Sequence, residues 1–139
     1  MAKKVGMKAN KKHGMIKNGK FYIGGHINRR KKGRGKIGTN ETNLSGRVAN
    51  IRRTDGRDFF VFAYIQLEVA SKARIELIES WVREGLESKY SHVGNDHFEF
   101  PMLNKVEGYE RFVNDALTLA VEICNMKHWD YTVIHKKVF

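Results

Sequence analysis

Basic side chains gather in the first third of the chain, and the chemistry that they favour is the binding of a polyanion. Residues 1–40 contain 13 Lys or Arg and no acid, whereas the whole chain has 26 Lys or Arg against 15 Asp or Glu. Because such a segment repels itself until a counter-charge is supplied, we expect nucleic acid as its partner, DNA first and RNA second. The side chains expected to contact its phosphates are Arg29, Arg30, Lys31, Lys32, Arg34, Lys36, Arg52 and Arg53.

The charge of the basic segment is compatible with two further roles. An anionic membrane surface would attract the same charge, but the segment lacks the Trp, Phe and Leu face of an interfacial helix, so no membrane partner is expected. A solubilising tail is the second alternative. Nucleic-acid binding explains the concentration of positive charge in the first third of the chain better than either of these roles.

Length and composition narrow the class of protein. The 139 residues are 41% hydrophobic, which is enough for one packed domain. No window approaches 18 apolar residues and the first 20 residues lack the apolar run of a signal peptide, so we expect the cytoplasm. The one cysteine, Cys124, excludes a multi-cysteine zinc site, and His92 and His97 lack a third ligand for zinc.

Hydrophobic periodicity predicts three helices and a buried strand, and these elements must position any site. Phe59 to Leu67 is nearly all apolar, which is typical of a strand buried on both faces. Residues 39–43 offer several helix caps, and residues 44–55, 71–87 and about 105–126 carry apolar stripes at helical spacing. The expected stripe residues are Leu44, Val48 and Ile51, then Ile75, Ile78, Val82 and Leu86 widened by Leu77 and Trp81, then Tyr109, Val113, Ala116, Leu117, Ala120, Ile123 and Cys124.

The ends of the chain complete the predicted organisation. Residues 1–12 are expected to form a basic arm, residues 13–27 to hold strands around the turn dipeptide Asn18-Gly19, and residues 128–139 to form a last strand or a docking tail. We therefore predict an α+β fold, in which a small mixed or antiparallel sheet carries helices on its faces. The core is expected over residues 13–100, with the helix and tail of residues 101–139 packed on it.

Four segments in this order resemble the GIY-YIG endonuclease superfamily, most closely its short phage and bacterial branch whose second strand reads KIG. They are the strand, polar turn and arginine-bearing helix of residues 35–51, the strand of residues 59–67, the glutamate helix around residues 73–82, and the closing glycine, acid and Phe signature of residues 93–100. The resemblance implies a β-β-α-β-α core and a phage or mobile-element source, and with it the cytoplasm of a bacterial host cell.

The resemblance allows two registers for the first hairpin. In one, residues 18–24 form the second strand and residues 14–16 replace the first. In the other, residues 21–23 form the first strand and Lys36-Ile37-Gly38 the second, which gives better spacing to Arg47 but puts Lys where many members have Tyr. We favour the second register. Tyr22, Arg47 and Glu79 keep the same roles in both.

What the resemblance implies is metal-dependent phosphodiester hydrolysis. Glu79 would hold Mg²⁺ or Mn²⁺, because a hard carboxylate suits these ions. Arg47, planar and always charged, would stabilise the charge that builds on the phosphorus. Tyr22 would activate water, and Lys36 would clamp the phosphate beside it.

Helical geometry tests two of these residues independently of the resemblance. At about 100° per residue, Arg47 lies about 40° outside its apolar stripe and Glu79 about 20° outside its own, so both can border the sheet. Glu76 lies about 60° further out and is expected to face water. Plain structural roles remain open: Tyr22 as a core residue, Arg47 as a flanking side chain, and Glu79 as an i,i+4 partner of Arg83.

The sequence therefore predicts a Mg²⁺-dependent DNA endonuclease, acting as a monomer or a homodimer. The alternative is a catalytically inactive DNA- or RNA-binding regulatory protein of the same fold, because the second tyrosine is missing. A third hypothesis is a structural, RNA-associated protein whose basic arm binds RNA, which needs neither Arg47 nor Glu79.

Overall fold

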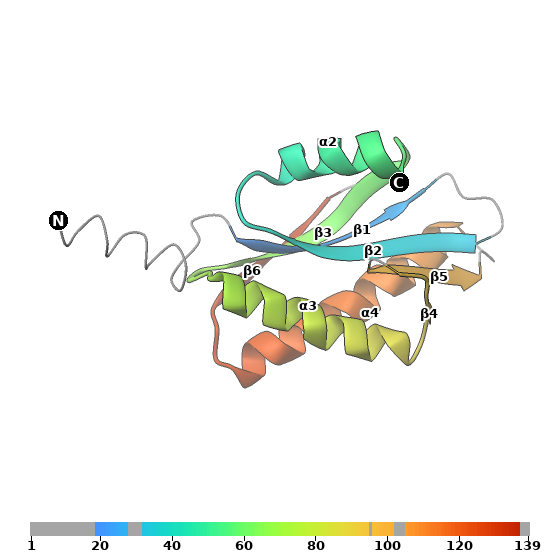
Figure 1. Cartoon of the computed structure of the whole chain (residues 1–139). Helices are drawn as coiled ribbons and strands as arrows, with labels where there is room; N and C mark the ends of the chain where they lie inside the picture. The colour runs from blue at the N-terminus through green and yellow to red at the C-terminus, as the bar shows by residue number, and fades with distance from the viewer. Residues whose placement is uncertain (1–18, 28–31, 95, 102–104, 137–139) are drawn as a thin grey trace.

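In the described part of the chain, a six-stranded antiparallel sheet packs with three helices (Figure 1). The computed structural model describes residues 19–27, 32–94, 96–101 and 105–136. The strand order is β4-β5-β2-β1-β3-β6. The elements are β1 (Lys20–His26), β2 (Lys32–Asn40), α2 (Leu44–Asp55), β3 (Phe59–Leu67), α3 (Lys72–Glu87), β4 (Ser91–His92), β5 (His97–Pro101), α4 (Lys105–Met126) and β6 (Tyr131–His135). The α+β class predicted from the sequence is confirmed.

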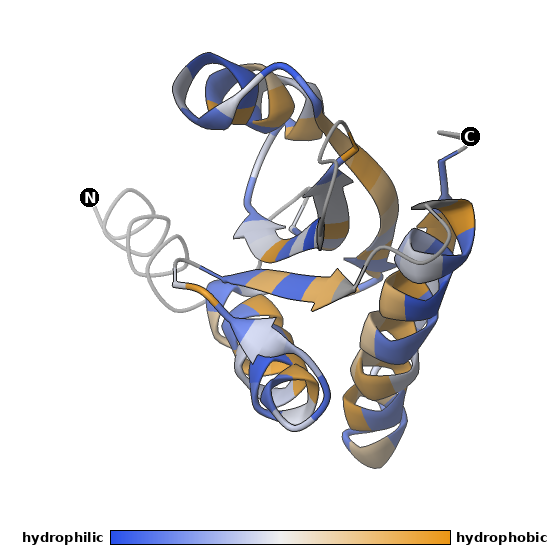
Figure 2. Cartoon of the chain, turned by 90° about the vertical axis from the view of Figure 1, so that its right-hand side faces the viewer, coloured by the Kyte–Doolittle hydropathy of each residue, from blue (hydrophilic) through white to orange (hydrophobic). Residues whose placement is uncertain are grey.

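The sheet separates two cores, because successive strand residues point to opposite faces. Helix α2 covers one face, and helices α3 and α4 cover the other (Figure 1). Phe21 and Ile23 of β1 belong to the large core under α3 and α4, whereas Tyr22 between them belongs to a small core under α2. Apolar and polar residues alternate along α3 and α4, as expected of helices with one face on a core (Figure 2).

The first hairpin takes the second of the two predicted registers. Tyr22 pairs with Gly38, Ile23 with Ile37, and Gly24 with Lys36. Residues 1–18 and 28–31 lie outside the described part of the chain, and with them the predicted arm, the strand material of residues 13–16, and Arg29, Arg30 and Lys31. The predicted last strand is β6, which pairs with β3.

Helix α2 is held by its ends as much as by its apolar side. The Asn43 side chain accepts hydrogen bonds from the backbone of Ser45 and Gly46, so the predicted capping segment does cap the helix. At the other end, Arg52 Nε donates to the Phe59 carbonyl oxygen at 2.7 Å, and its guanidinium lies 4.6 Å from the Phe60 ring centre. These contacts tie the end of α2 to the start of β3.

Helices α3 and α4 follow their predicted stripes closely. Ser71 caps α3, and the four residues of the α3 stripe are buried. Leu77, predicted to widen that stripe, is exposed instead, because it lies about 200° around the helix from Ile75. The apolar residues predicted for α4 are all buried in the large core, so the C-terminal helix packs on the same domain. Among the described residues, no helix combines the length and the apolar character needed to cross a membrane.

Candidate active site

Strands β1 and β2 bring Tyr22 and Lys36 to the face of the sheet that α2 partly covers. Tyr22 is fully buried, and Lys36 keeps only 7% of its surface exposed. A side chain at Gly38, the partner of Tyr22 across the hairpin, would overlap the Tyr22 ring and hydroxyl. Gly38 therefore leaves the space that the tyrosine occupies.

Beyond its pairing with β5, the edge of β2 is reached by charged residues from the other face of the sheet. Strand β5 pairs with β2 only from Lys32 to Lys36. Next to that pairing, the backbone N–H of Ile37 donates to the Asp96 carbonyl oxygen at 3.1 Å. Glu79 and Arg83 of α3 lie beside Asp96, so helix α3 contributes charged groups at this edge of β2.

Arg83 joins two carboxylates at this edge. Its guanidinium lies 3.0 Å from Glu79 Oε1 and 2.6 Å from Asp96 Oδ1. The hydrogen bond with Asp96 raises the pKa of Arg83 above its usual value, and the charge of Glu79 adds to this. The i,i+4 pair of Glu79 and Arg83 considered from the sequence is therefore present, but it is one half of a three-residue network.

Arg47 and Glu79 act on one phenol from helices on opposite faces of the sheet. Burial raises the pKa of Tyr22, the nearby Arg47 guanidinium lowers it, and the charges of Glu79 and Asp96 raise it again. The Tyr22 hydroxyl is buried and has no hydrogen-bond partner of good geometry among the described residues, so Arg47 approaches without satisfying it. Arg47 and Glu79 therefore both influence the buried Tyr22 phenol, and the catalytic roles expected for the three residues remain predictions.

Lys36 belongs to the same electrostatic group. Burial lowers the pKa of Lys36, Asp96 works against this, and the positive charge of Arg47 lowers the pKa further. The charge of Glu79 also reaches Lys36. Arg47 and Glu79 therefore act electrostatically on both Tyr22 and Lys36.

The carboxylates of Glu79 and Asp96 at the edge of β2 are hard oxygen ligands of the kind that a divalent cation prefers, but they are few. Burial and the charge of Asp96 raise the pKa of Glu79, and Arg83 opposes the rise. A second positive charge near Glu79 would relieve the repulsion between these two acids. Within the described ranges no group of three or more His, Cys, Asp or Glu converges on one point. Since Mg²⁺ keeps several waters and needs one or two carboxylates plus substrate phosphate, Glu79 fits as a single protein ligand.

The remaining predicted phosphate contacts have different surroundings. Arg34 lies on the same sheet face as Lys36 and pairs with His26 across the hairpin. Arg53 is exposed and bonds to Asn50 of its own helix. Arg52 is engaged with β3, so its main role is structural. Lys32 begins β2.

Several charged residues of this region were given no role from the sequence. Asp96 stood inside the closing motif, but nothing in the motif showed that it bonds to Arg83, which is 13 residues away. His26 follows Tyr22 by four residues along a strand, a spacing that puts both on one face and was the available signal. His97 is buried against His26, whereas His92 stacks on Phe98 of the opposite face, so the two histidines considered for zinc are separated.

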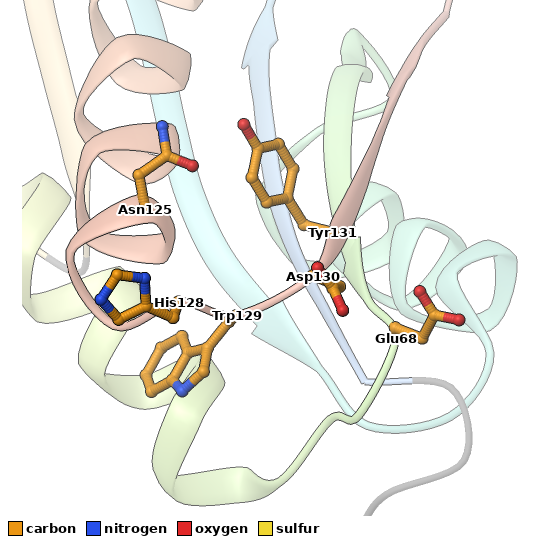
Figure 3. Close-up of a pocket in the computed structure, with 6 residues that line it drawn as sticks. All are labelled: Glu68, Asn125, His128, Trp129, Asp130 and Tyr131. Atoms are coloured by element: carbon orange, nitrogen blue, oxygen red, sulfur yellow. The ribbon is translucent and has the colours of Figure 1, made fainter.

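A separate pocket of about 450 Å³ lies at the turn between α4 and β6, beside the end of β3 (Figure 3). Two of its side chains are carboxylates, which repel phosphate. None of the predicted site residues lines it. The lining residues are Glu68, Asn125, His128, Trp129, Asp130 and Tyr131.

Comparison of the chain with protein-family models, with curated proteins and with solved structures finds no match in any of the three. The function is therefore inferred from the residues of this chain and their arrangement.

Proposed function

We propose that this protein is a Mg²⁺-dependent DNA endonuclease of GIY-YIG type, with the β-β-α-β-α core between residues 13 and 100. The observation that supports the proposal most directly is the joint action of Arg47 and Glu79 on the Tyr22 hydroxyl. These residues come from α2 and α3, which lie on opposite faces of the sheet (Figure 1). A purely structural arrangement would not need both charges at one buried phenol.

Each side chain has a task that its surroundings suit. Arg47, exposed and always charged, would bind the scissile phosphate and stabilise the charge that grows on it. Lys36 would hold a non-bridging phosphate oxygen. Tyr22 would orient the attacking water and, as the phenolate, take up its proton; burial raises the pKa of the phenol, and the Arg47 guanidinium offsets part of that rise.

Glu79 would hold the metal ion, with Arg83 fixing the orientation of its carboxylate through the 3.0 Å contact. When bound, a divalent ion stabilises the departing oxyanion as a Lewis acid. Asp96 would hold Arg83 in place from the other side at 2.6 Å.

An inactive nucleic-acid-binding regulator of the same fold is the second candidate. Lys36 stands where many GIY-YIG members have a tyrosine, and Arg83 already pairs with both Glu79 and Asp96. Both observations are compatible with a protein that binds DNA without cutting it.

Plasmid nicking in Mg²⁺, Mn²⁺ or EDTA tests the proposal. Wild type should nick only with metal, and Glu79→Ala should reduce nicking by about 100-fold or more while DNA binding is retained. Glu76→Ala is the matched control, because Glu76 is an exposed glutamate on the same helix and should cut like wild type. Equal cutting by wild type and Glu79→Ala would contradict the catalytic assignment. Tight DNA binding without cleavage in any metal would favour the inactive regulator, and a preference for RNA without a metal effect would favour the RNA-associated protein.

A further inference from the structure

Strand β6 leaves one edge of the sheet open, because no described strand pairs with it on the side away from β3. Proteins protect such edges by keeping them short or by placing Pro, bulges or charged side chains on them. The opposite edge, β4, is short, with the two residues Ser91–His92. Strand β6 has five residues, YTVIH, none of them Pro, Gly, Lys, Arg, Asp or Glu, and it pairs with β3 in one continuous register. An unprotected edge of strand-forming residues is suited to pairing with another strand.

The hydrogen bonds to β3 decide which backbone groups of β6 face outwards. The N–H of Glu68 donates to the Asp130 carbonyl oxygen at 3.0 Å. The N–H of Lys136 donates to the Phe62 carbonyl oxygen at 2.7 Å. Since alternate residues of an antiparallel pair bond to the partner strand, the even-numbered residues of β6 bond to β3 and the odd-numbered residues point their N–H and C=O groups away from it. The residues with outward backbone groups are Tyr131, Val133 and His135.

A second copy of β6 fits this edge in one symmetric register. When two antiparallel β6 strands are centred on Val133, Val133 faces its own counterpart and Tyr131 faces His135 on either side. All the outward backbone groups of both strands are then paired across the contact. Centring the contact one residue to either side leaves some of these groups beyond the end of the other strand. The same surface serves both copies, so the assembly closes as a dimer.

The same register brings opposite charges together at both ends of the contact. Asp130 of each copy lies opposite Lys136 of the other, and both side chains are exposed. Facing residues of this kind, which do not exchange backbone hydrogen bonds, have side chains close enough for an ion pair. Asp130 also lines the pocket of Figure 3 together with Glu68, so the incoming lysine meets two carboxylates. Centring the contact one residue to either side separates these charges.

We propose that this protein forms a homodimer through the open edge of β6, with Val133 on the twofold axis and ion pairs between Asp130 and Lys136 at the two ends. The proposal is independent of the nuclease function. Strand β3 lies between the contact and the strands β1 and β2 that carry Tyr22 and Lys36, so each copy keeps its candidate site away from the contact. Because an edge of five residues makes a small interface, we expect a weak dimer whose population rises with protein concentration.

Sedimentation equilibrium of the full chain measures the dimer. The average mass of wild type should rise from 16.1 kDa towards twice that value as the concentration increases to about 1 mM. Val133→Pro removes an outward N–H that bonds nothing in β3, so the variant should fold, as checked by circular dichroism, and stay monomeric. Arg111→Asp changes a 70% exposed side chain on α4 and should sediment like wild type.

Charge reversal tests the register of the contact. Asp130→Lys and Lys136→Asp each place like charges at both ends and should each weaken dimerisation by about 10-fold. The double variant Asp130→Lys with Lys136→Asp restores opposite charges and should dimerise like wild type. Within one strand the two positions are roughly 20 Å apart, so this rescue arises only between two copies.

Amide hydrogen exchange followed by NMR identifies the edge itself. In the dilute monomer the outward N–H of Val133 should exchange fast, whereas the N–H groups of Thr132 and Ile134, which point to β3, should exchange slowly. At high concentration the N–H of Val133 should become protected as well.

A wild type that stays monomeric at about 1 mM would overturn the proposal, as would a folded Val133→Pro that dimerises normally. Single charge variants that dimerise like wild type, or a double variant that does not recover, would also overturn it. A dimer that leaves the Val133 N–H unprotected would place the interface elsewhere, and protection already present in the monomer would mean that the same chain covers the edge. If Val133→Pro does not fold, the charge variants decide.

Discussion

His26 and His97 are two buried histidines on the α2 side of the sheet, close to positively charged side chains. Both rings are buried and stacked on each other, next to Lys36 and Arg34. A proton on His97 would add a positive charge to a group that already holds two fixed cations. The lowered pKa keeps His97 neutral at physiological pH, so it adds no further positive charge to this buried face.

The lowered pKa of His97 predicts a loss of stability in weak acid. Unfolded histidine takes up its proton near pH 6.5, whereas folded His97 does so only near pH 4, so the unfolded state binds more protons between these values. The stabilising contribution is fully present above pH 6.5 and is lost as the pH falls towards 4, by up to ~3 kcal/mol in the free energy of unfolding. Urea denaturation of wild type and His97→Asn at pH 7.0, 5.5 and 4.5 should show a flatter pH dependence for the variant.

The matched control for this experiment is His128→Asn. His128 is exposed and has a φ of 57°, a conformation that asparagine adopts readily, so its pH dependence should follow wild type. The raised pKa of Glu79 makes the free energy of unfolding fall as the pH rises, opposite to the effect of His97. Glu79 is present in all three proteins, so its effect is the same in each. If the free energy of unfolding of His97→Asn changed with pH as steeply as that of wild type, His97 would not be the group that destabilises the protein in weak acid.

At the scale of elements, local patterns predicted the helices and left the strand order open. The apolar stripes and capping residues were enough to predict α2 and α3, because the residues on the buried face of a helix recur every three or four positions. The contacts that build the site are between distant residues: His26 meets Asp58 from 32 positions away and Arg83 meets Asp96 from 13. Sequence spacing carries no signal for such pairs, so the contacts of Arg83 and Asp58 around the four candidate residues could not be predicted.

Helix α2 depends on Arg52 more than its amphipathic pattern suggests. Only Ile51 is buried on this helix, so the hydrogen bond to the Phe59 carbonyl oxygen and the contact with the Phe60 ring carry much of its docking. Arg52→Ala should lower the free energy of unfolding by about 2 kcal/mol, measured by urea denaturation. Arg53→Ala, one position along and exposed, should change it by less than about 0.5 kcal/mol. Equal effects of the two variants would show that Arg52 is a surface cation like its neighbour.

Charge divides the whole molecule along the sheet. Helix α2 carries three arginines and one aspartate, whereas α4 on the other face carries four acids and two basic residues. The site residues Tyr22 and Lys36 lie on the α2 side, and the acidic pocket at the end of α4 has no part in the site. We therefore expect a nucleic-acid partner to be attracted to the α2 face, which holds the proposed chemistry, and repelled from the α4 face.

This asymmetry predicts that equal charge reversals on the two faces have unequal effects on DNA binding. Each phosphate neutralised by the protein contributes about −0.9 to the slope of log K against log salt concentration. Arg53→Glu on α2 should weaken binding and make that slope shallower by about one contact, because an exposed arginine on the helix that carries Arg47 is replaced by a charge that repels phosphate. Arg111→Glu makes the same change on α4, where its partner is Glu107, and should leave both affinity and slope near wild type. Fluorescence anisotropy with one duplex between about 50 and 200 mM salt measures both quantities. Similar losses for the two variants would mean that DNA contacts both faces, and the α2 side would lose its claim to be the binding surface.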